Sequence, residues 1–516
     1  MAVLFFALTV WIRFRLSSVP LERDEGEYAY MAQQLLQGIL PYSETQSMKF
    51  PGIYFVYAGI LTLFGESPSA IHLSLILFNL ATAFILFLLG RHLLNLTAGV
   101  FAAVSFSVLT LSPEVQGLWA NSEHFVLLPA LAGILLLLVM KGGPAKFFLS
   151  GILLGSSLLI KQHAVFYCLF GAFYMGFRFL SRTQSLKIRD ITLFAVGGII
   201  PLLLTLILYS LSGHMAQFWF STVQYASEYV SLTSFREGYE NFKYSFARIL
   251  EYNFSILWLA LIGLASIAWV KDKKERFVFL FSFFIFLFLA ITPGFYFRPH
   301  YFLLWIPALC LLAGAGVESL VYGLSSPKIK NFTRTVVIFV ALAIPFLLQK
   351  DIFFNMTPFQ VTRMVYGLNP FAESLQVASY IREHSSENQK VAVLGSEAQI
   401  YFFSNRKSAT RHIYMYPLME RHVYARGMRS ELVREIETNQ PEFVVIANLG
   451  GSWVSQRPYI PPTLNDWSQV YLKHNYEIRG VVDIRAGQKS VFKWDEEAKS
   501  YNPKSRYHLL IYKRRS

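Results

Sequence analysis

The strongest constraint on the fold is a series of eleven apolar segments, each long enough or nearly long enough to cross a lipid bilayer. A helix needs roughly 20 apolar residues to cross a typical hydrocarbon core. Only 15% of the residues are charged, against about 25% in an ordinary soluble domain. The chain is therefore predicted to be a polytopic α-helical membrane protein with about eleven transmembrane helices. The segments span residues 1–17, 71–90, 98–113, 125–140, 147–160, 163–177, 191–211, 254–270, 277–292, 301–322 and 335–349.

The positions of the basic residues predict the orientation of these helices. Lys and Arg are enriched in cytoplasmic loops. With a cytoplasmic N-terminus, every second loop should be basic, and each of these loops is. Their basic residues are Arg91, His92, Lys141, Lys146, Arg178, Arg182, Lys187, Arg189, Lys271, Lys273, Lys274, Arg276, Lys328, Lys330 and Arg334. The loops 18–70, 212–253 and 293–300 are then expected outside, together with the tail beyond about residue 350.

Four further features of the sequence bear on this prediction. The net charge of +14 comes from short clusters between apolar runs, so no nucleic-acid partner is expected. Residues 1–11 lack a basic start and a small-residue cleavage site, which favours a retained first helix over a signal peptide. Arg13 and Arg15 break the charge rule at the outer end of that helix, and they either reach lipid headgroups or face an anion. Cys168 and Cys310 both lie in apolar segments, so no disulfide framework is implied.

The tail has a different composition, and it is predicted to form a soluble α/β domain over residues 351–516, after a membrane domain over 1–350. Short β-rich runs occur at 390–394, 442–447, 476–483 and 507–512, and helical stretches at 371–383, 427–439 and 465–474. Four tail residues can either line a sugar site or be ordinary surface residues: Glu397, Tyr401, Arg406 and Arg411.

The first outer loop begins with an acidic pair, Asp24 and Glu25, where helical periodicity also begins. The pattern predicts an amphipathic helix along the membrane surface, ended by Gly38 and Pro41. Asp24 followed by Glu27 resembles a capping box, in which Asp24 only satisfies free N–H groups. Alternatively, the acidic pair lies in a cleft, where a carboxylate can accept the proton of an attacking hydroxyl.

Lys49 lies later in this loop, before Pro51 and a second interfacial helix expected at 53–64. A Lys at that depth is costly unless it meets an anion, and a lipid phosphate is the obvious candidate. Ordinary extension of the side chain to the interface is the alternative.

The motif Asp24-Glu25-Gly26-Glu27-Tyr28-Ala29, followed by Lys49-x-Pro51, resembles the first outer loop of GT-C glycosyltransferases. Within that group it is similar to the protein O-mannosyltransferase-like branch of glycosyltransferase family 39 type, which includes the aminoarabinose transferases of lipid A. The resemblance covers about residues 1–350. It implies a polyprenyl-phosphate sugar as donor, inversion at the anomeric centre, and no metal or cofactor.

The resemblance also implies roles for single residues. Asp24 would be the general base, with Glu25 orienting or assisting, and Lys49 would neutralise the donor phosphate. Tyr28, in the same motif, is a further site candidate. The aminoarabinose transferases have an Arg where this chain has Glu27, which points away from a charged sugar.

Two more outer positions carry ionisable side chains. Glu123 resembles a second acidic residue of the family site, although Asn121 or Ser122 next to it can instead cap the following helix. Lys161 interrupts apolar sequence at the outer end of the fifth segment, where it either contacts a second phosphate oxygen or reaches the interface.

The turn before the tenth segment contains Arg298, His300 and Tyr301, which resemble a family position at the donor pocket. The guanidinium of Arg298 suits a phosphate because its fork can bind two oxygens. His300 is either a catalyst or a satisfied interfacial residue.

These observations favour an inverting membrane glycosyltransferase that acts on an extracytoplasmic protein, lipid or glycan acceptor, in a bacterial inner membrane. The alternative is a transporter or a flippase for lipid-linked sugars. Transporters usually place ionisable groups near the bilayer midplane and often show repeated halves. Here the acids and bases lie in the outer loops and no repeat is visible. A scaffold merely anchored in the membrane would not need eleven segments.

Overall fold

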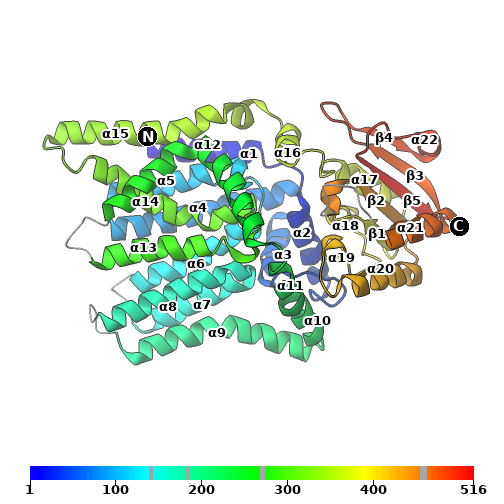
Figure 1. Ribbon diagram of the computed structural model, residues 1–516, viewed down its shortest axis with the longest axis horizontal. Helices are drawn as coiled ribbons and strands as arrows, with labels where there is room; N and C mark the ends of the chain where they lie inside the picture. Colours follow the sequence, from blue (N-terminus) through cyan, green and yellow to red (C-terminus); the bar gives the residue numbers. More distant parts are fainter. Residues whose placement is uncertain (139–142, 182–185, 268–273, 454–461, 516) are drawn as a thin grey trace.

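The computed structural model describes residues 1–138, 143–181, 186–267, 274–453 and 462–515. Within these ranges each predicted apolar segment overlaps one long helix, although 301–322 begins in a short 3₁₀ helix, and the long helices run side by side in one bundle (Figure 1). They are α1 (Ala2–Arg15), α4 (Pro68–Leu93), α5 (Leu96–Leu109), α6 (Ser122–Leu138), α7 (Ala145–Ile160), α8 (Val165–Leu180), α9 (Ile188–Leu211), α12 (Phe235–Ile267), α13 (Lys274–Leu289), α14 (Ile306–Leu320) and α15 (Pro327–Leu348). Of the predicted loop residues, Lys141, Arg182, Lys271 and Lys273 lie outside the described ranges.

The bundle presents an apolar exterior. Among the described residues, five helices, which include α4, α9 and α15, are long and apolar enough to cross a membrane. The outer helix α9 exposes Ile199 and Leu204, each about 60% accessible. Exposing apolar side chains of this kind to lipid costs little free energy, whereas exposing them to water is unfavourable. The prediction of a multi-pass helical membrane protein is confirmed.

Neighbouring helices approach closely at small residues. A Cβ atom added to Gly151 of α7 would lie 2.1 Å from the carbonyl oxygen of Phe194 in α9. Small residues at such a crossing allow backbone contact, which provides much of the association energy of helices in lipid.

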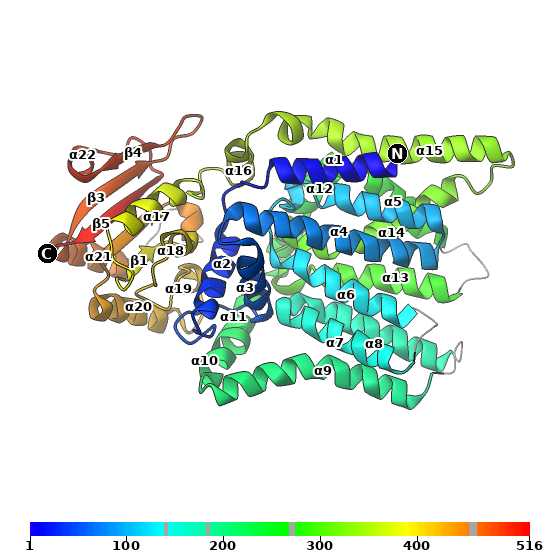
Figure 2. The ribbon, with the colours of Figure 1, turned by 180° about the vertical axis from the view of Figure 1, so that it is seen from behind.

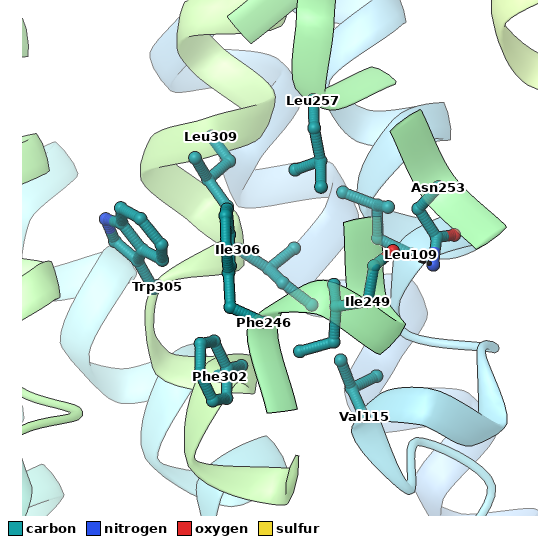
Figure 3. A pocket seen from close by; sticks show the side chains of 10 residues that line it. All are labelled: Leu109, Val115, Phe246, Ile249, Asn253, Leu257, Phe302, Trp305, Ile306 and Leu309. Carbon is teal, nitrogen blue, oxygen red and sulfur yellow. Dashed lines mark hydrogen bonds between the residues drawn. The ribbon is translucent and has the colours of Figure 1, made fainter. Parts of the chain in front are cut away.

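Helix α12 bends at Asn253, whose φ and ψ of −128° and 16° are not helical. The Asn253 amide donates to the Ile249 carbonyl at 3.1 Å and to the Ser112 hydroxyl at 3.3 Å. Figure 3 shows the apolar pocket beside this bend. Its volume of about 10 Å³ is near the minimum for one water molecule, so it cannot hold a substrate.

The two arginines near the end of α1 make no ion pair with an acidic side chain within the described ranges. Arg13 donates to the carbonyl oxygens of Gly117 at 2.8 Å and Thr110 at 2.6 Å. Arg15 donates to the carbonyl oxygens of Phe353 and Met356. Within the described ranges the two side chains are thus held by backbone carbonyls and not by an acidic residue of the protein.

Short helices lie between the bundle and the C-terminal part of the chain (Figure 2). They include α2 (Arg23–Leu36), α3 (Gly52–Phe64), α10 (Met215–Trp219) and α11 (Ala226–Val230). The other short helices before residue 350 are η1 (Pro113–Val115), η2 (Gln162–Ala164), η3 (Phe220–Tyr225), η4 (Pro293–Phe295) and η5 (Pro299–Leu304). Helix α2 packs against α3 on one side and against α18 (Gln399–Ser404) of the C-terminal part on another. The sequence predicted a surface helix, but 11 of the 14 residues of α2 are buried.

The C-terminal part contains a five-stranded sheet in the order β1-β2-β5-β3-β4. Strand β1 pairs with β2 in parallel, with Val393 opposite Val445, and the other pairs are antiparallel. The strands are β1 (Val391–Leu394), β2 (Phe443–Asn448), β3 (Tyr476–Asp483), β4 (Val491–Trp494) and β5 (His508–Arg514). The helices after α15 are η6 (Asp351–Asn355), α16 (Pro358–Tyr366), α17 (Glu373–Glu383), α18, α19 (Tyr416–Met419), α20 (Ala425–Asn439), η7 (Gly450–Ser452), α21 (Pro462–Asn475) and α22 (Asp495–Ser500). The predicted α/β character is confirmed, while β4 was missed because this short strand is only half-buried.

Candidate active site

A cavity of about 500 Å³ lies where the helix bundle, the short connecting helices and the C-terminal part meet. Its size is in the usual range for small-molecule sites, and its walls carry several charged side chains. The walls come from the first outer loop, the start of α8, helix α11, the turn before α14 and the C-terminal part. Lining residues include Arg23, Asp24, Glu27, Lys49, Lys161, His163, Tyr229, Arg298, His300, Tyr301, Tyr366, Tyr414 and Tyr416.

The start of α2 is capped by Glu22 and not by Asp24. The Glu22 carboxylate accepts a hydrogen bond from the Glu25 amide at 3.1 Å, and Glu25 accepts one from the Glu22 amide at 3.1 Å. This reciprocal pair is a capping box. The capping role suggested for Asp24 is therefore wrong, because the box begins two residues earlier. Asp24 is left available for other contacts.

Asp24 faces the cavity and is bound through one carboxylate oxygen. Its Oδ1 accepts hydrogen bonds from Lys49 Nζ at 3.0 Å and from the Tyr414 hydroxyl at 2.7 Å. In the described ranges, Oδ2 of Asp24 makes no hydrogen bond. Burial raises the pKa of Asp24, but the adjacent Lys49 ammonium outweighs burial and holds that pKa well below its usual range. A carboxylate with one free oxygen can accept a proton from a bound group.

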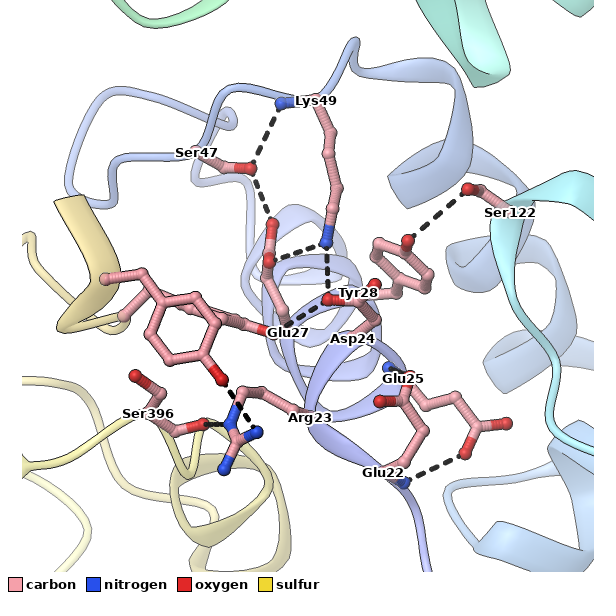
Figure 4. A network of polar contacts seen from close by, with 12 residues as sticks. Glu22, Arg23, Asp24, Glu25, Glu27, Tyr28, Ser47, Lys49, Ser122 and Ser396 are labelled. Atoms are coloured by element: carbon pink, nitrogen blue, oxygen red, sulfur yellow. Dashed lines mark hydrogen bonds and ion pairs between the residues drawn. The ribbon is translucent and has the colours of Figure 1, made fainter. Parts of the chain in front are cut away.

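Lys49 is paired with two carboxylates. Besides Asp24, its Nζ binds Glu27 Oε2 at 2.9 Å and lies 4.5 Å from the centre of the Tyr28 ring (Figure 4). Glu27 is itself held by the hydroxyls of Tyr54 and Ser47. Burial lowers the pKa of Lys49, but the charges of Asp24 and Glu27 outweigh burial and raise it well above its usual value. Lys49 is thus a fixed cation in the cavity wall.

Glu25 lies on a different face of α2 from Asp24 and does not line the cavity. It is fully buried, where it accepts hydrogen bonds from His72 Nε2 at 2.8 Å and from the Ala120 amide. Adjacent residues on a helix point in different directions, whereas residues three apart share a face. The structure therefore brings Glu27, and not the predicted Glu25, next to Asp24.

A second ion pair lies deeper in the bundle. Glu123 Oε1 accepts from Lys161 Nζ at 2.6 Å, and the Lys161 ammonium lies 4.6 Å from the centre of the Tyr301 ring. Glu123 is fully buried behind the cavity wall, which Lys161 and Tyr301 line. The alternative cap, Asn121, makes no side-chain hydrogen bond within the described part of the chain.

His300 lies beside this pair, with Nε2 3.8 Å from Glu123 Oε1. Its Nδ1 is hydrogen-bonded to the Gln116 side chain at 2.7 Å. Burial lowers the pKa of His300 to about 4, so the ring is neutral near pH 7. His300 can accept or donate hydrogen bonds, but it adds no charge to the cavity.

Arg298 is a cavity cation without a carboxylate partner among the described residues. Its Nη2 donates to the Tyr229 hydroxyl at 3.3 Å, and its guanidinium lies 5.5 Å from the centre of the Tyr296 ring. Most of its donors remain available to a ligand. Lys49, Lys161 and Arg298 together make the cavity suited to an anionic group such as a phosphate.

The C-terminal part supplies residues that the sequence did not predict. Tyr414 contacts Asp24, and Tyr416 accepts a hydrogen bond from Arg23 Nη1 at 3.0 Å. Neither tyrosine lies in a recognisable motif, and each is about 390 residues from its partner. Gly26 belongs to this contact as well, because a Cβ atom there would lie 2.6 Å from the Gln399 backbone nitrogen.

The four tail residues suggested for a sugar site do not line the cavity, nor are they ordinary surface residues. Glu397 is fully buried and pairs with Arg23 at 2.9 Å. The Tyr401 hydroxyl accepts from the Val393 amide, and Arg406 and Arg411 donate to backbone carbonyls. All four hold the C-terminal part together or attach it to the first outer loop.

A protein-family model matches part of the chain. Residues 48–209 match the family model of dolichyl-phosphate-mannose-protein mannosyltransferases. No curated protein sequence matches the chain significantly. Lys49, Glu123 and Lys161 lie within the matched range.

Two solved structures share the fold along nearly the whole chain. ArnT from Cupriavidus metallidurans, bound to undecaprenyl phosphate, is 14% identical with a TM-score of 0.61, over 99% of this chain and 97% of ArnT. The oligosaccharyltransferase AglB from Archaeoglobus fulgidus, in complex with an inhibitory peptide and a dolichol-phosphate, is 10% identical with a TM-score of 0.57, over 96% of this chain and 74% of AglB. The chain therefore has the GT-C glycosyltransferase fold, and residues 48–209 carry the sequence pattern of the dolichyl-phosphate-mannose-protein mannosyltransferases.

Proposed function

We propose that this protein transfers a sugar from a polyprenyl-phosphate donor to a hydroxyl or amide acceptor, with inversion at the anomeric carbon. The observation that carries the proposal is the contact between the Asp24 carboxylate and the Lys49 ammonium in the wall of a large buried cavity. A base and a phosphate-binding cation side by side are what this reaction requires.

The reaction can be written with named atoms. The acceptor X–H attacks the anomeric carbon of the donor while Oδ2 of Asp24 takes its proton. The bond between the anomeric carbon and the phosphate oxygen breaks, and its electrons leave with the polyprenyl phosphate. Lys49, Lys161 and Arg298 stabilise the negative charge on the leaving phosphate. The proton on Asp24 then passes to solvent.

Donor binding would also activate the base. Lys49 holds the pKa of Asp24 low, and such a carboxylate is a weak base. A donor phosphate that draws the Lys49 ammonium toward itself reduces that effect, and the pKa of Asp24 rises. The carboxylate becomes a better base when the leaving group is in place.

The similar structures support the class of donor. ArnT was solved with undecaprenyl phosphate and AglB with a dolichol-phosphate. From the distribution of apolar and basic residues we assign residues 1–350 to a membrane domain and 351–516 to an extracytoplasmic domain, with a cytoplasmic N-terminus. We place the protein in a bacterial inner membrane, which its sparse cysteines favour.

The test is a transfer assay on membranes that contain the protein, supplied with radiolabelled polyprenyl-phosphate sugars of several kinds. We expect one of them to label an endogenous acceptor, in membranes with the wild-type protein only. Movement of labelled lipid across the bilayer without covalent transfer would overturn the proposal and identify a flippase.

A further inference from the structure

The hydroxyl of Tyr414 lies 2.7 Å from Oδ1 of Asp24, although the two residues belong to different parts of the molecule. Tyr414 lies between α18 and α19, on the C-terminal side of the cavity. Its ring also faces the Lys49 ammonium, which is 5.7 Å from the ring centre. The contact joins the C-terminal part directly to the carboxylate that we propose as the base.

The segment that carries Tyr414 is fixed on both sides. The neighbouring residues Ile413 and Met415 are fully buried, and the Met415 amide donates to the Ser396 hydroxyl at 3.0 Å. The carbonyl of Arg411 accepts from the Gln46 amide of the first outer loop at 2.8 Å. A hydroxyl on such a segment has a defined position relative to α2.

The two carboxylate oxygens of Asp24 differ in the number of hydrogen bonds that they accept. Tyr414 and Lys49 both donate to Oδ1, while Oδ2 has no partner in the described part of the chain. Two donors on one oxygen fix the rotation of the carboxylate, so the unshared lone pairs of Oδ2 point away from both donors. A general base must be held in this way within hydrogen-bond reach of its proton.

We propose that Tyr414 is a positioning residue for the reaction, whose hydroxyl orients the Asp24 carboxylate so that Oδ2 meets the acceptor. The proposal rests on the proposed function for its consequence in catalysis. It makes the C-terminal part a component of the reaction centre, in addition to any part it has in acceptor binding.

Removing the hydroxyl should have two separate effects. A hydrogen bond to a carboxylate favours the charged form, so Tyr414→Phe should raise the pKa of Asp24. The loss of a hydrogen bond to a charged group should also lower kcat by about ten- to a hundredfold. The KM for the donor should change little, because Lys49, Lys161 and Arg298 remain.

The other charged or titratable groups around Asp24 stay in place in this variant, so they do not produce the shift. They are Glu22, Arg23, Glu27, Tyr28, Lys49, Tyr57, Arg298, His300, Tyr301, Tyr366 and Tyr416.

The experiment measures the full-length protein in nanodiscs in two ways. The first measures kcat and kcat/KM for sugar transfer as a function of pH. The acidic limb of the pH profile of kcat/KM should lie at higher pH in Tyr414→Phe than in the wild type. The second needs no substrate: the rate at which a carbodiimide modifies Asp24, followed by mass spectrometry at fixed pH. Carbodiimides react with the protonated carboxyl, so each unit of pKa gained should raise this rate about tenfold.

Tyr424→Phe is the matched control, because the Tyr424 ring packs on Phe220 and its hydroxyl makes no hydrogen bond within the described residues. We expect it to leave both readouts at the wild-type level. If Tyr414→Phe behaves like Tyr424→Phe in both, the proposal is overturned. Faster labelling of Asp24 in a protein that transfers no sugar would support the contact and instead remove the proposed function.

Discussion

The buried ion pair between Arg23 and Glu397 should control whether the C-terminal part stays attached to α2. Arg23 Nη2 lies 2.9 Å from Glu397 Oε1, with side-chain exposures of 11% and 0%. Arg23 also donates to the Ser396 carbonyl and to the Asn369 side chain. All of these acceptors lie beyond the membrane bundle, so Arg23, next to Asp24, makes several of the contacts that dock the C-terminal part.

Breaking this pair from either side leaves a buried charge without its partner. Such a change typically costs about 3–5 kcal/mol. We therefore expect Glu397→Met and Arg23→Met each to destabilise the docked state by about that amount. The double variant should cost less than the sum of the two, with a coupling of about 1–3 kcal/mol, because the pair is lost only once.

Hydrogen exchange in nanodiscs measures this cost locally. The amides of α18 should exchange faster by about two to four orders of magnitude in each single variant, which corresponds to the expected loss of about 3–5 kcal/mol. Glu497→Ala removes an exposed pair with Lys493 and should change exchange by less than about threefold. Strictly additive effects of the two Met substitutions, or unchanged exchange in α18, would refute the reasoning.

Three further predictions concern the cavity. Lys49→Met should weaken donor binding by about ten- to a hundredfold, measured by equilibrium binding. It should also move the acidic limb of the pH profile of kcat/KM to higher pH, because the ammonium that lowers the pKa of Asp24 is gone. Activity is then lost at a higher pH as the solution is acidified; an unmoved limb would contradict the pairing. Glu123→Ala should lower the free energy of unfolding of the bundle by about 3–5 kcal/mol, measured by thermal unfolding, because Lys161 loses its buried partner. An unchanged unfolding temperature would show that the pair is solvated. Arg298→Lys should reduce donor affinity despite the retained charge, because Lys lacks the planar fork, and equal affinity would argue against a two-oxygen contact.

Much of the membrane fold could be predicted from the sequence because lipid imposes a simple rule. Every spanning helix must be apolar, so the segments that became α4, α9 or α15 are visible as runs in the chain. Strands such as β1 and β3 could be predicted for a different reason. Both are short runs rich in β-branched residues.

The site could be predicted only in part. Asp24, Lys49, Lys161 and Arg298 were found because charge at the end of an apolar segment is unusual, and all four line the cavity. The role of Glu25 was misjudged because sequence neighbours were treated as spatial neighbours, although the helix turns them apart.

The contributions of the C-terminal part could not be foreseen. Tyr414 and Glu397 reach α2 through the packing of two parts of the chain that are far apart in sequence. Spacing and periodicity describe one element at a time and contain no signal for such a contact. The need for glycine at position 26 could not be predicted from the sequence either. It arises because the backbone of α18 packs directly against Gly26 and leaves no room for a Cβ atom.

The central claim is that the free oxygen of Asp24 removes the proton from the acceptor, and one measurement tests it most directly. The initial rate of sugar transfer by the purified protein should be compared for wild type and Asp24→Asn, with donor affinity measured on the same samples. Because Glu22 caps α2, the Asn variant should fold and should bind the donor with little change. We predict a rate lower by about 10²- to 10⁴-fold, the usual contribution of a general base. A rate within about threefold of wild type, a barrier change under about 1 kcal/mol, would contradict the account.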